Sequence, residues 1–236
     1  MTNSASPLHQ DFHLDSASVV IYTSRHGAAA RLPQLQGQPV HEILRHKDRT
    51  TIKGTRSRFV AGSAKHMDLK EYIRDVPDFP EPGIIFKDIT PLLGDVQAFG
   101  YTISQLVERY KDADIDVIVP IESRGFLFGA PLARELGKAI VPVRKPGKLP
   151  AETLSTDYEL EYGTNTMEIH ADGVKKGQKV LIIDDLLATG GTLGATARLV
   201  EMAGGVVSEI GVIIELCFLD GRKNLAGYDV YSMIQY

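Results

Sequence analysis

Residues 180–192 have the sequence VLIIDDLLATGGT, and this run determines the fold that the chain is predicted to adopt. Its first four residues are large and apolar, as in a strand that is buried on both faces of a sheet. The pair Gly190-Gly191 then permits a tight turn, and residues 193–203 have the apolar spacing of a helix. A strand, a tight turn and a helix in this order are typical of a parallel α/β sheet, whose ligands lie beyond the carboxyl ends of the strands.

The same alternation of strands and helices extends on both sides of this run. Buried strands are predicted at residues 115–121 and 209–217, and shorter strands at 139–143 and 166–170. Helices are predicted at 95–111, where Asp95 caps the first turn, and at 125–136, which Gly137 ends. We therefore expect an α/β fold with a central, mostly parallel sheet and helices on both faces.

Two other segments do not follow this alternation. Residues 68–75 have apolar positions that suit a short amphipathic helix, and the prolines within residues 78–89 then favour an extended stretch. Residues 145–166 form a long polar segment rich in Gly, Pro and Thr, so we expect a flexible lid there.

The polar residues of the run 180–192 indicate what binds beside it. Backbone amides of the turn and of the first helical residues favour an anion, and two threonine hydroxyls add donors. The two carboxylates would repel a phosphate, so we expect them to face vicinal hydroxyls or a metal-bound group. A phosphate beside a diol has the shape of ribose 5-phosphate. The predicted phosphate cradle comprises Asp184, Asp185, Ala188, Thr189, Gly190, Gly191 and Thr192.

Residues 1–66 differ in composition from the rest of the chain. They contain nine Lys/Arg against four Asp/Glu and six of the seven histidines, whereas residues 67–236 contain 17 Lys/Arg against 26 Asp/Glu. We expect a basic, His-rich, disordered N-terminal extension, followed by a catalytic domain at 67–236. The extension has four interpretations: a dispensable segment, sequence translated ahead of a true start at Met67, a targeting peptide, or a nucleic-acid-binding tail.

Composition also argues against several classes of protein. No run approaches the roughly 18–20 apolar residues that span a bilayer, and the N-terminus lacks the pattern of a secretory signal. Cys217 is the only cysteine, which excludes internal disulfides and cysteine-rich metal sites and suits a reducing cytoplasm. The sequence contains neither G-x-x-x-x-G-K-[ST] nor G-x-G-x-x-G, so these two common phosphate-binding motifs are absent.

The run 180–192 resembles the motif with which type I phosphoribosyltransferases bind 5-phosphoribosyl-1-pyrophosphate (PRPP). Three further runs narrow the resemblance: DFPEPGIIFKDI at 78–89, IESRGFLFG at 121–129, and VRKPGKLP with YELEYG within 142–163. Together they are similar to the adenine phosphoribosyltransferase family over residues 67–236. The resemblance implies the type I phosphoribosyltransferase fold and the conversion of adenine and PRPP to AMP and pyrophosphate. It also implies a requirement for Mg²⁺, held mainly through PRPP, and a cytoplasmic homodimer.

The resemblance implies that a set of cationic residues binds pyrophosphate, the leaving group of the reaction. Arg144, Lys145 and Lys148 lie within five residues at the start of the expected lid. On spacing alone they suit a solvated surface run, whereas the resemblance makes them a clamp for pyrophosphate, together with Ser123 and Arg124. The family often has a non-proline cis peptide in this loop, which we expect here between Glu122 and Ser123.

Two further groups of residues are assigned by resemblance. Glu161 matches the family's proposed acid/base carboxylate, and it joins Arg124, Asp184 and Asp185 as a candidate for catalysis; its plain alternative is a solvated glutamate. Adenine binding is expected at Ile85, Phe86 and Lys87, where the ring of Phe86 would stack on the purine unless it is simply part of the core. Many family members have Arg in place of Lys87, which leaves a bidentate role for that side chain in question.

Two alternative functions remain open from the sequence. One is transfer to another acceptor, such as hypoxanthine, xanthine or orotate. The other is a nucleic-acid-binding regulator that senses PRPP, which only the basic charge of residues 1–66 favours.

Overall fold

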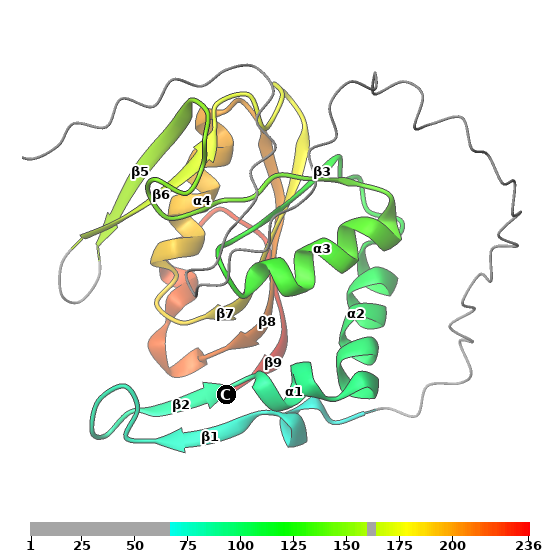
Figure 1. Cartoon of the computed structure of the whole chain (residues 1–236), viewed down its shortest axis with the longest axis vertical. Coiled ribbons are helices and arrows are strands. Elements are labelled where there is room, and N and C mark those ends of the chain that lie inside the picture. The colour runs from blue at the N-terminus through cyan, green and yellow to red at the C-terminus, as the bar shows by residue number, and fades with distance from the viewer. Residues whose placement is uncertain (1–66, 160–163) are drawn as a thin grey trace, which may run out of the picture. The chain divides into compact units, whose positions relative to one another are not determined.

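The centre of the fold is a sheet of five parallel strands, seen in the computed structural model, which describes residues 67–159 and 164–236 (Figure 1). Neighbouring strands are parallel throughout the sheet. The strands, in spatial order, are β4 (Ala139–Ile140), β3 (Val117–Pro120), β7 (Lys179–Leu187), β8 (Val206–Glu215) and β9 (Val230–Gln235).

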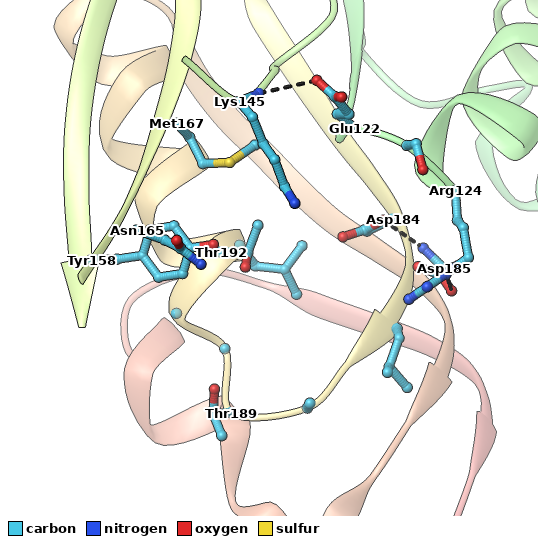
Figure 2. A pocket seen from close by; sticks show the side chains of 16 residues that line it. Glu122, Arg124, Lys145, Tyr158, Asn165, Met167, Asp184, Asp185, Thr189 and Thr192 are labelled. Carbon is cyan, nitrogen blue, oxygen red and sulfur yellow. Dashed lines mark hydrogen bonds and ion pairs between the residues drawn. The ribbon is translucent and has the colours of Figure 1, made fainter. Parts of the chain in front are cut away.

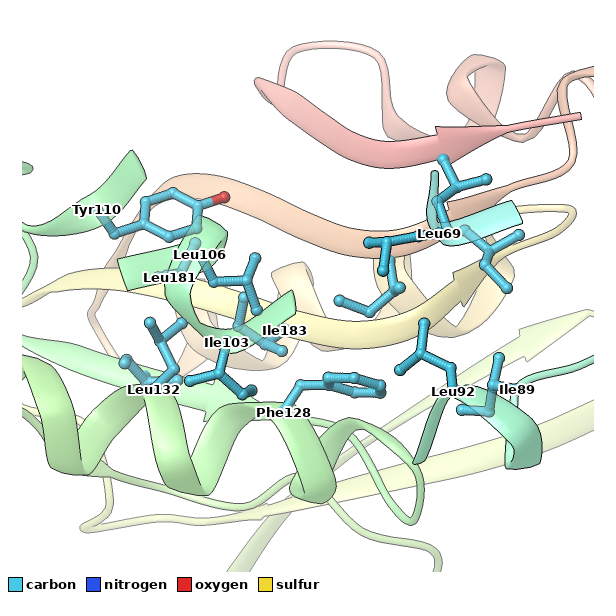
Figure 3. Packing of buried hydrophobic residues seen from close by; sticks show 14 of the residues in the cluster. Leu69, Ile89, Leu92, Ile103, Leu106, Tyr110, Phe128, Leu132, Leu181 and Ile183 are labelled. Atoms are coloured by element: carbon cyan, nitrogen blue, oxygen red, sulfur yellow. The ribbon is translucent and has the colours of Figure 1, made fainter. Parts of the chain in front are cut away.

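Helices cover both faces of this sheet because the side chains of β7 alternate between them. Leu181 and Ile183 pack with the first core cluster, under α2 (Val96–Tyr110) and α3 (Gly125–Leu136), as Figure 3 shows. Val180 and Ile182 pack with the second cluster, under α4 (Gly191–Met202). The predicted α/β fold, with helices on both faces of a parallel sheet, is confirmed.

The ends of the two predicted helices are also confirmed. The Asp95 carboxylate accepts hydrogen bonds from the amides of Gln97 and Ala98 at 2.9 and 2.8 Å, which caps α2. Gly137 ends α3 with φ of 64°, in the left-handed region that favours glycine.

The helix predicted at residues 68–75 is wrong for most of its length. Only a 3₁₀ turn, η2 (Leu69–Tyr72), forms there. The strand β1 (Arg74–Pro77) follows it and pairs antiparallel with β2 (Ile85–Asp88), before the short helix α1 (Thr90–Gly94). Ion pairs across the two strands, Arg74 with Asp88 at 2.5 Å and Lys87 with Asp75 at 2.6 Å, favour the hairpin over a local helix.

The segment expected to form a lid contains one strand that was not predicted, and the strand predicted at residues 166–170 is confirmed, two residues longer at its start. β5 (Thr153–Glu159) pairs antiparallel with β6 (Thr164–His170). The buried side chains of Met167 and Ile169 anchor β6 in the core cluster under α4. The hairpin therefore stands beside the sheet rather than within it.

The C-terminal part of the fold differs from the prediction in detail. β8 begins at Val206 and ends at Glu215, earlier than expected, because two 3₁₀ helices follow it: η3 (Cys217–Leu219) and η4 (Gly221–Leu225). β9 was not predicted. Among the described residues, no helix has both the length and the apolar character needed to span a bilayer.

Candidate active site

A cavity of about 380 Å³ opens at the carboxyl ends of β3 and β7, between the β5–β6 hairpin and the start of α4 (Figure 2). It brings together the cradle and the loop after β3, which are about 60 residues apart in the sequence. The residues that line it are Glu122, Ser123, Arg124, Lys145, Tyr158, Asn165, Met167, Asp184, Asp185, Leu186, Ala188, Thr189, Gly190, Gly191, Thr192 and Leu193.

The cradle turn, residues 188–192, exposes backbone donors to this cavity. Gly190 has φ of 83° and precedes the first residue of α4. The amides of Gly191, Thr192 and Leu193 open the helix and have no hydrogen-bond acceptor among the residues that the structure describes. Such amides, at the positive end of a helix dipole, form an anion-binding site.

The two carboxylates lie inside β7 rather than after it, because the strand continues to Leu187. This corrects the expectation that the strand ends at residue 183. Asp185 is 4% exposed and accepts a hydrogen bond from Arg124. The amide of Asp185 donates to Oδ1 of Asp184 at 2.9 Å. Burial, together with the adjacent carboxylate of Asp185, raises the pKa of Asp184 well above its usual range.

The loop between β3 and α3 contains the predicted non-proline cis peptide, between Glu122 and Ser123, which is confirmed. The carboxylate of Glu122 accepts hydrogen bonds from Nε of Arg144 at 3.0 Å and from the amide of Lys145 at 3.1 Å. Burial alone would raise the pKa of Glu122, but these donors outweigh it and lower that pKa. An ionised Glu122 therefore holds the chain that leaves β4 against this loop.

The three cations expected to clamp pyrophosphate lie in different surroundings. The side chain of Lys145 points into the cavity, toward the side of the carboxylates (Figure 2). Arg144 is occupied by Glu122 and by the carbonyl of Lys148, to which it donates at 3.0 Å. Arg144 and Lys148 do not line the cavity. Ser123 and Arg124 do, beside the carboxylates of β7.

The residues expected to bind adenine lie on the β1–β2 hairpin and do not line this cavity. Ile85 is exposed, and the ring of Phe86 packs edge-on against Phe79 at 5.2 Å between centroids. Lys87 donates to Asp75 at 2.6 Å, and its Nζ lies 4.0 Å from the centre of the Tyr236 ring. Its side chain is thus engaged within the protein. Glu161 lies outside the described residues.

Several cavity residues were missed by the sequence reasoning. Tyr158 comes from β5, and Asn165 and Met167 come from β6. A signal for β5 does exist: Leu154 and Tyr158 stand on one face of a two-residue alternation, with Thr156 between them. Glu122, Leu186 and Leu193 were also missed as lining residues, although each adjoins a residue that was predicted.

The site and the fold match known proteins. The model of the phosphoribosyl transferase domain matches residues 93–225. An adenine phosphoribosyltransferase of Caldanaerobacter subterraneus subsp. tengcongensis is 61% identical over 169 residues, which cover 72% of this chain and 98% of that protein. The crystal structure of adenine phosphoribosyltransferase from Thermoanaerobacter pseudethanolicus is 60% identical, with a TM-score of 0.69, over 71% of this chain and 98% of that one.

A third similarity brings in a structure with ligands. The adenine phosphoribosyltransferase of Saccharomyces cerevisiae was solved with D-2,5-dideoxy-2,5-imino-altritol 1,6-bisphosphate and adenine. It is 40% identical, with a TM-score of 0.66, over 70% of this chain and 96% of that one. By the domain match, the sequence identity and the shared fold, the chain belongs to the adenine phosphoribosyltransferase family.

Proposed function

We propose that the chain transfers the 5-phosphoribosyl group of PRPP to adenine, with AMP and pyrophosphate as products, as a step of purine salvage. One observation carries the proposal: the amides that open α4, a carboxylate pair and two cations, Arg124 and Lys145, all border one cavity. PRPP has a matching group for each: its 5′-phosphate for the helix amides, its ribose hydroxyls for the carboxylates, and its pyrophosphate for the cations. Family membership then makes adenine the acceptor.

The cradle holds the part of PRPP that does not react. The amides of Gly190, Gly191 and Thr192 and the hydroxyls of Thr189 and Thr192 bind the 5′-phosphate, and Ala188 forms the entry to the turn. Asp184 and Asp185 accept hydrogen bonds from the ribose hydroxyls. Fixing both ends of the ribose phosphate orients C1 toward the incoming base.

The reaction separates charge at C1 of the ribose. The bond from C1 to the pyrophosphate oxygen breaks, the ring gains positive charge, and N9 of adenine forms the new bond and loses its proton. Ser123, Arg124 and Lys145 stabilise the negative charge of the leaving pyrophosphate, and Arg144 and Lys148 add positive charge beside them. Glu161 accepts the proton of the base.

Mg²⁺ is proposed as the cofactor, bound mainly through the phosphates of PRPP. Among the described residues, no group of three or more His, Cys, Asp or Glu side chains could hold a metal. The pair Asp184 and Asp185 fits a Mg²⁺ that takes one or two carboxylates and otherwise substrate oxygens and water. When bound, the ion neutralises charge on the pyrophosphate.

The remaining parts of the proposal concern adenine and the assembly. Phe86 stacks on the purine, and the backbone of Ile85 and Lys87 reads its edge, once the β1–β2 hairpin meets the bound base. The enzyme acts in the cytoplasm as a homodimer. The domain at 67–236 carries the activity, and the extension at 1–66 takes no part in the chemistry.

Release of pyrophosphate with different bases tests this function. The full-length chain is incubated with PRPP and Mg²⁺ and, in separate reactions, adenine, hypoxanthine, xanthine and orotate. Turnover is expected with adenine and at least about 100-fold lower with the other bases, because a site built for the edge of one base leaves polar groups unpaired with another. Absence of turnover with adenine would contradict the proposal.

A further inference from the structure

The 3₁₀ helix η4 packs directly against the outer side of the cradle turn. A Cβ atom built on Gly190 would lie 2.4 Å from the carbonyl oxygen of Gly221, and one built on Gly221 would lie 2.1 Å from the carbonyl oxygen of Ala188. Both distances are far below van der Waals contact, so the two backbones meet at a spacing that only glycine allows. The cradle is therefore backed by main chain from a segment about 30 residues later in the sequence.

One side chain of η4 bonds the cradle itself. Nδ2 of Asn224 donates to the carbonyl oxygen of Thr189 at 2.7 Å. The peptide between Thr189 and Gly190 is trans, since the cis bonds of the described chain lie elsewhere. In a planar trans peptide the C=O and N–H point in opposite directions. Holding the Thr189 oxygen outward therefore turns the amide of Gly190 the other way, toward the cavity that this residue lines.

The helix η4 is in turn fixed to the sheet. Arg222 donates from Nε and Nη2 to the two carboxylate oxygens of Glu215 at 2.6 and 2.7 Å, and from Nη1 to the carbonyl of Val230 at 3.0 Å. Glu215 is 4% exposed at the end of β8. A bidentate pair to a buried carboxylate sets both the position and the orientation of the helix. The side chain of Asn224 is thus presented from a rigid support.

We propose that Asn224 is a positioning residue for PRPP: by holding the Thr189 carbonyl, it orients the Gly190 amide toward the 5′-phosphate. The proposal rests on the proposed function of the cradle. Asn224 does not line the cavity and touches no reacting atom. Without the side-chain amide of Asn224, the peptide between Thr189 and Gly190 samples other orientations. Phosphate binding must then order this peptide, which lowers the affinity for PRPP. Adenine is proposed to bind at the β1–β2 hairpin and not at the cradle. Its affinity should therefore not depend on the hydrogen bond between Asn224 and Thr189.

Steady-state kinetics and ribose 5-phosphate titration of the full chain test this inference. Asn224→Leu removes the donor at similar size without adding charge, and Asn224→Ser is a second variant if the first unfolds. Both are expected to raise the KM for PRPP and the Kd for ribose 5-phosphate about fivefold, the usual effect of one lost hydrogen bond. The KM for adenine and the melting temperature are expected to stay unchanged. Asn224→Gln, which keeps an amide donor, should recover part of the affinity.

Lys223 provides a matched control on the same helix, because it is exposed and, within residues 67–159 and 164–236, its side chain pairs with Asp220 alone, at 2.5 Å. Lys223→Gln should leave both constants unchanged. Wild-type KM for PRPP in both Asn224→Leu and Asn224→Ser would overturn the inference, as would an equal rise in Lys223→Gln. These results presuppose that the wild-type chain turns over adenine; if it does not, the proposed function fails instead, and the ribose 5-phosphate titration still reports on Asn224.

Discussion

Nε of Arg124 donates to Oδ2 of Asp185 at 2.5 Å, and this bond joins the start of α3 to the site strand β7. The two side chains differ in exposure: that of Asp185 is 6% exposed and that of Arg124 is 48% exposed. One edge of the guanidinium is therefore occupied by the carboxylate, while its Nη atoms have no acceptor among the described residues and the residue lines the cavity. Arg124 has the geometry to bond Asp185 and an anionic ligand at the same time.

Arg124→Lys is expected to lower kcat/KM for PRPP by about 10–100-fold. A lysine keeps the charge, but its donors all lie on one nitrogen, so it cannot reproduce the spacing at which Nε bonds Asp185 while the Nη atoms are left for pyrophosphate. Initial rates over a range of PRPP concentrations measure the effect. Arg134→Lys, on the exposed face of the same helix, is the control and should behave as wild type. Full activity in Arg124→Lys would show that catalysis does not need the guanidinium to bond Asp185 and pyrophosphate at the same time.

Asp184→Asn is expected to stabilise the ligand-free chain while it weakens PRPP binding. The raised pKa of Asp184 means that the folded state binds more protons than the unfolded state above pH 3.8, so stability falls as pH rises through the folded pKa. Asparagine is neutral at every pH, so the variant does not place an ionised carboxylate at this buried position. At pH 7.5 the melting temperature should rise by about 2–4 °C, which corresponds to about 1 kcal/mol in a domain of this size.

Calorimetry between pH 4 and pH 8 checks this prediction. The difference between Asp184→Asn and wild type should shrink as pH falls toward about 4, where the wild-type carboxyl is also neutral. Asp172→Asn, at an exposed position, should show no difference at any pH. A lower melting temperature for Asp184→Asn at pH 7.5 would contradict the raised pKa of Asp184.

The ion pair of Glu215 and Arg222 predicts the opposite dependence on pH. The Arg222 guanidinium, helped by Ser232 and Gln235, lowers the pKa of Glu215 from 4.5 to about 2 even though burial opposes it. The ion pair therefore makes its full contribution to the free energy of unfolding above pH 4.5, and this contribution is lost as pH falls toward 2. Glu215→Gln should lower the free energy of unfolding by about 2 kcal/mol at pH 7.

Urea unfolding of wild type and Glu215→Gln at pH 7, 4.5 and 3 measures this contribution. The gap between them should narrow at pH 3, because Glu215 of the unfolded wild-type chain is then protonated while the folded state still holds the carboxylate mostly ionised. Glu135→Gln removes an exposed pair with Arg134 and should change stability by less than about 0.5 kcal/mol. A gap that is constant over this pH range would show that charge is not what Glu215 contributes.

Residues 67–236 expressed alone are expected to fold and to keep the kcat/KM of the full chain. Among the described residues, the two core clusters draw on the whole length of this part of the chain, from Leu69 to Ile234. Circular dichroism and initial rates, measured beside the full-length chain, test the point. A loss of more than about tenfold in kcat/KM, or of the cooperative melt, would mean that residues 1–66 belong to the catalytic unit.

Glu161→Ala is expected to lower kcat by at least about tenfold and to change the KM for PRPP much less. A general base acts only in the transition state, so its removal affects turnover more than substrate binding. Glu152→Ala, an exposed glutamate before β5, serves as the control. If Glu161→Ala has the wild-type kcat, the proton of the base must go to another acceptor.

Local signals in the sequence sufficed for much of the fold. The capping carboxylate of Asp95, the terminal Gly137 and the apolar run of β7 each act over a few residues, and these three features were predicted correctly, although β7 continues to Leu187. The β1–β2 hairpin and β9 depend on pairing with another strand, 8 to 14 residues away for β1 and 20 residues away for β9. β1 is held by ion pairs to β2, and β9 is an edge strand that pairs on one side with β8. No short-range pattern encodes such pairings.

The candidate site likewise contains residues that a local motif predicted and residues that depend on contacts farther along the chain. The residues of the predicted cradle are nearly consecutive, so a linear motif was enough to pick out this part of the cavity lining. Tyr158 and Asn165 reach the cavity only because β5, which was not predicted, pairs with β6 and folds beside α4. The bond from Asn224 to Thr189 spans 35 residues and depends on η4, which no sequence pattern had marked.

The contact between Gly190 and Gly221 has a consequence for the evolution of the chain. A side chain at either position would strike a carbonyl oxygen of the main chain, which no substitution at a neighbouring position removes. Selection for second-site suppressors should therefore recover none for Gly190→Ala or Gly221→Ala, whereas a clash with a side chain would yield them. Within a library of variants, the two positions should each accept one residue type, independently of the background in which they are tested.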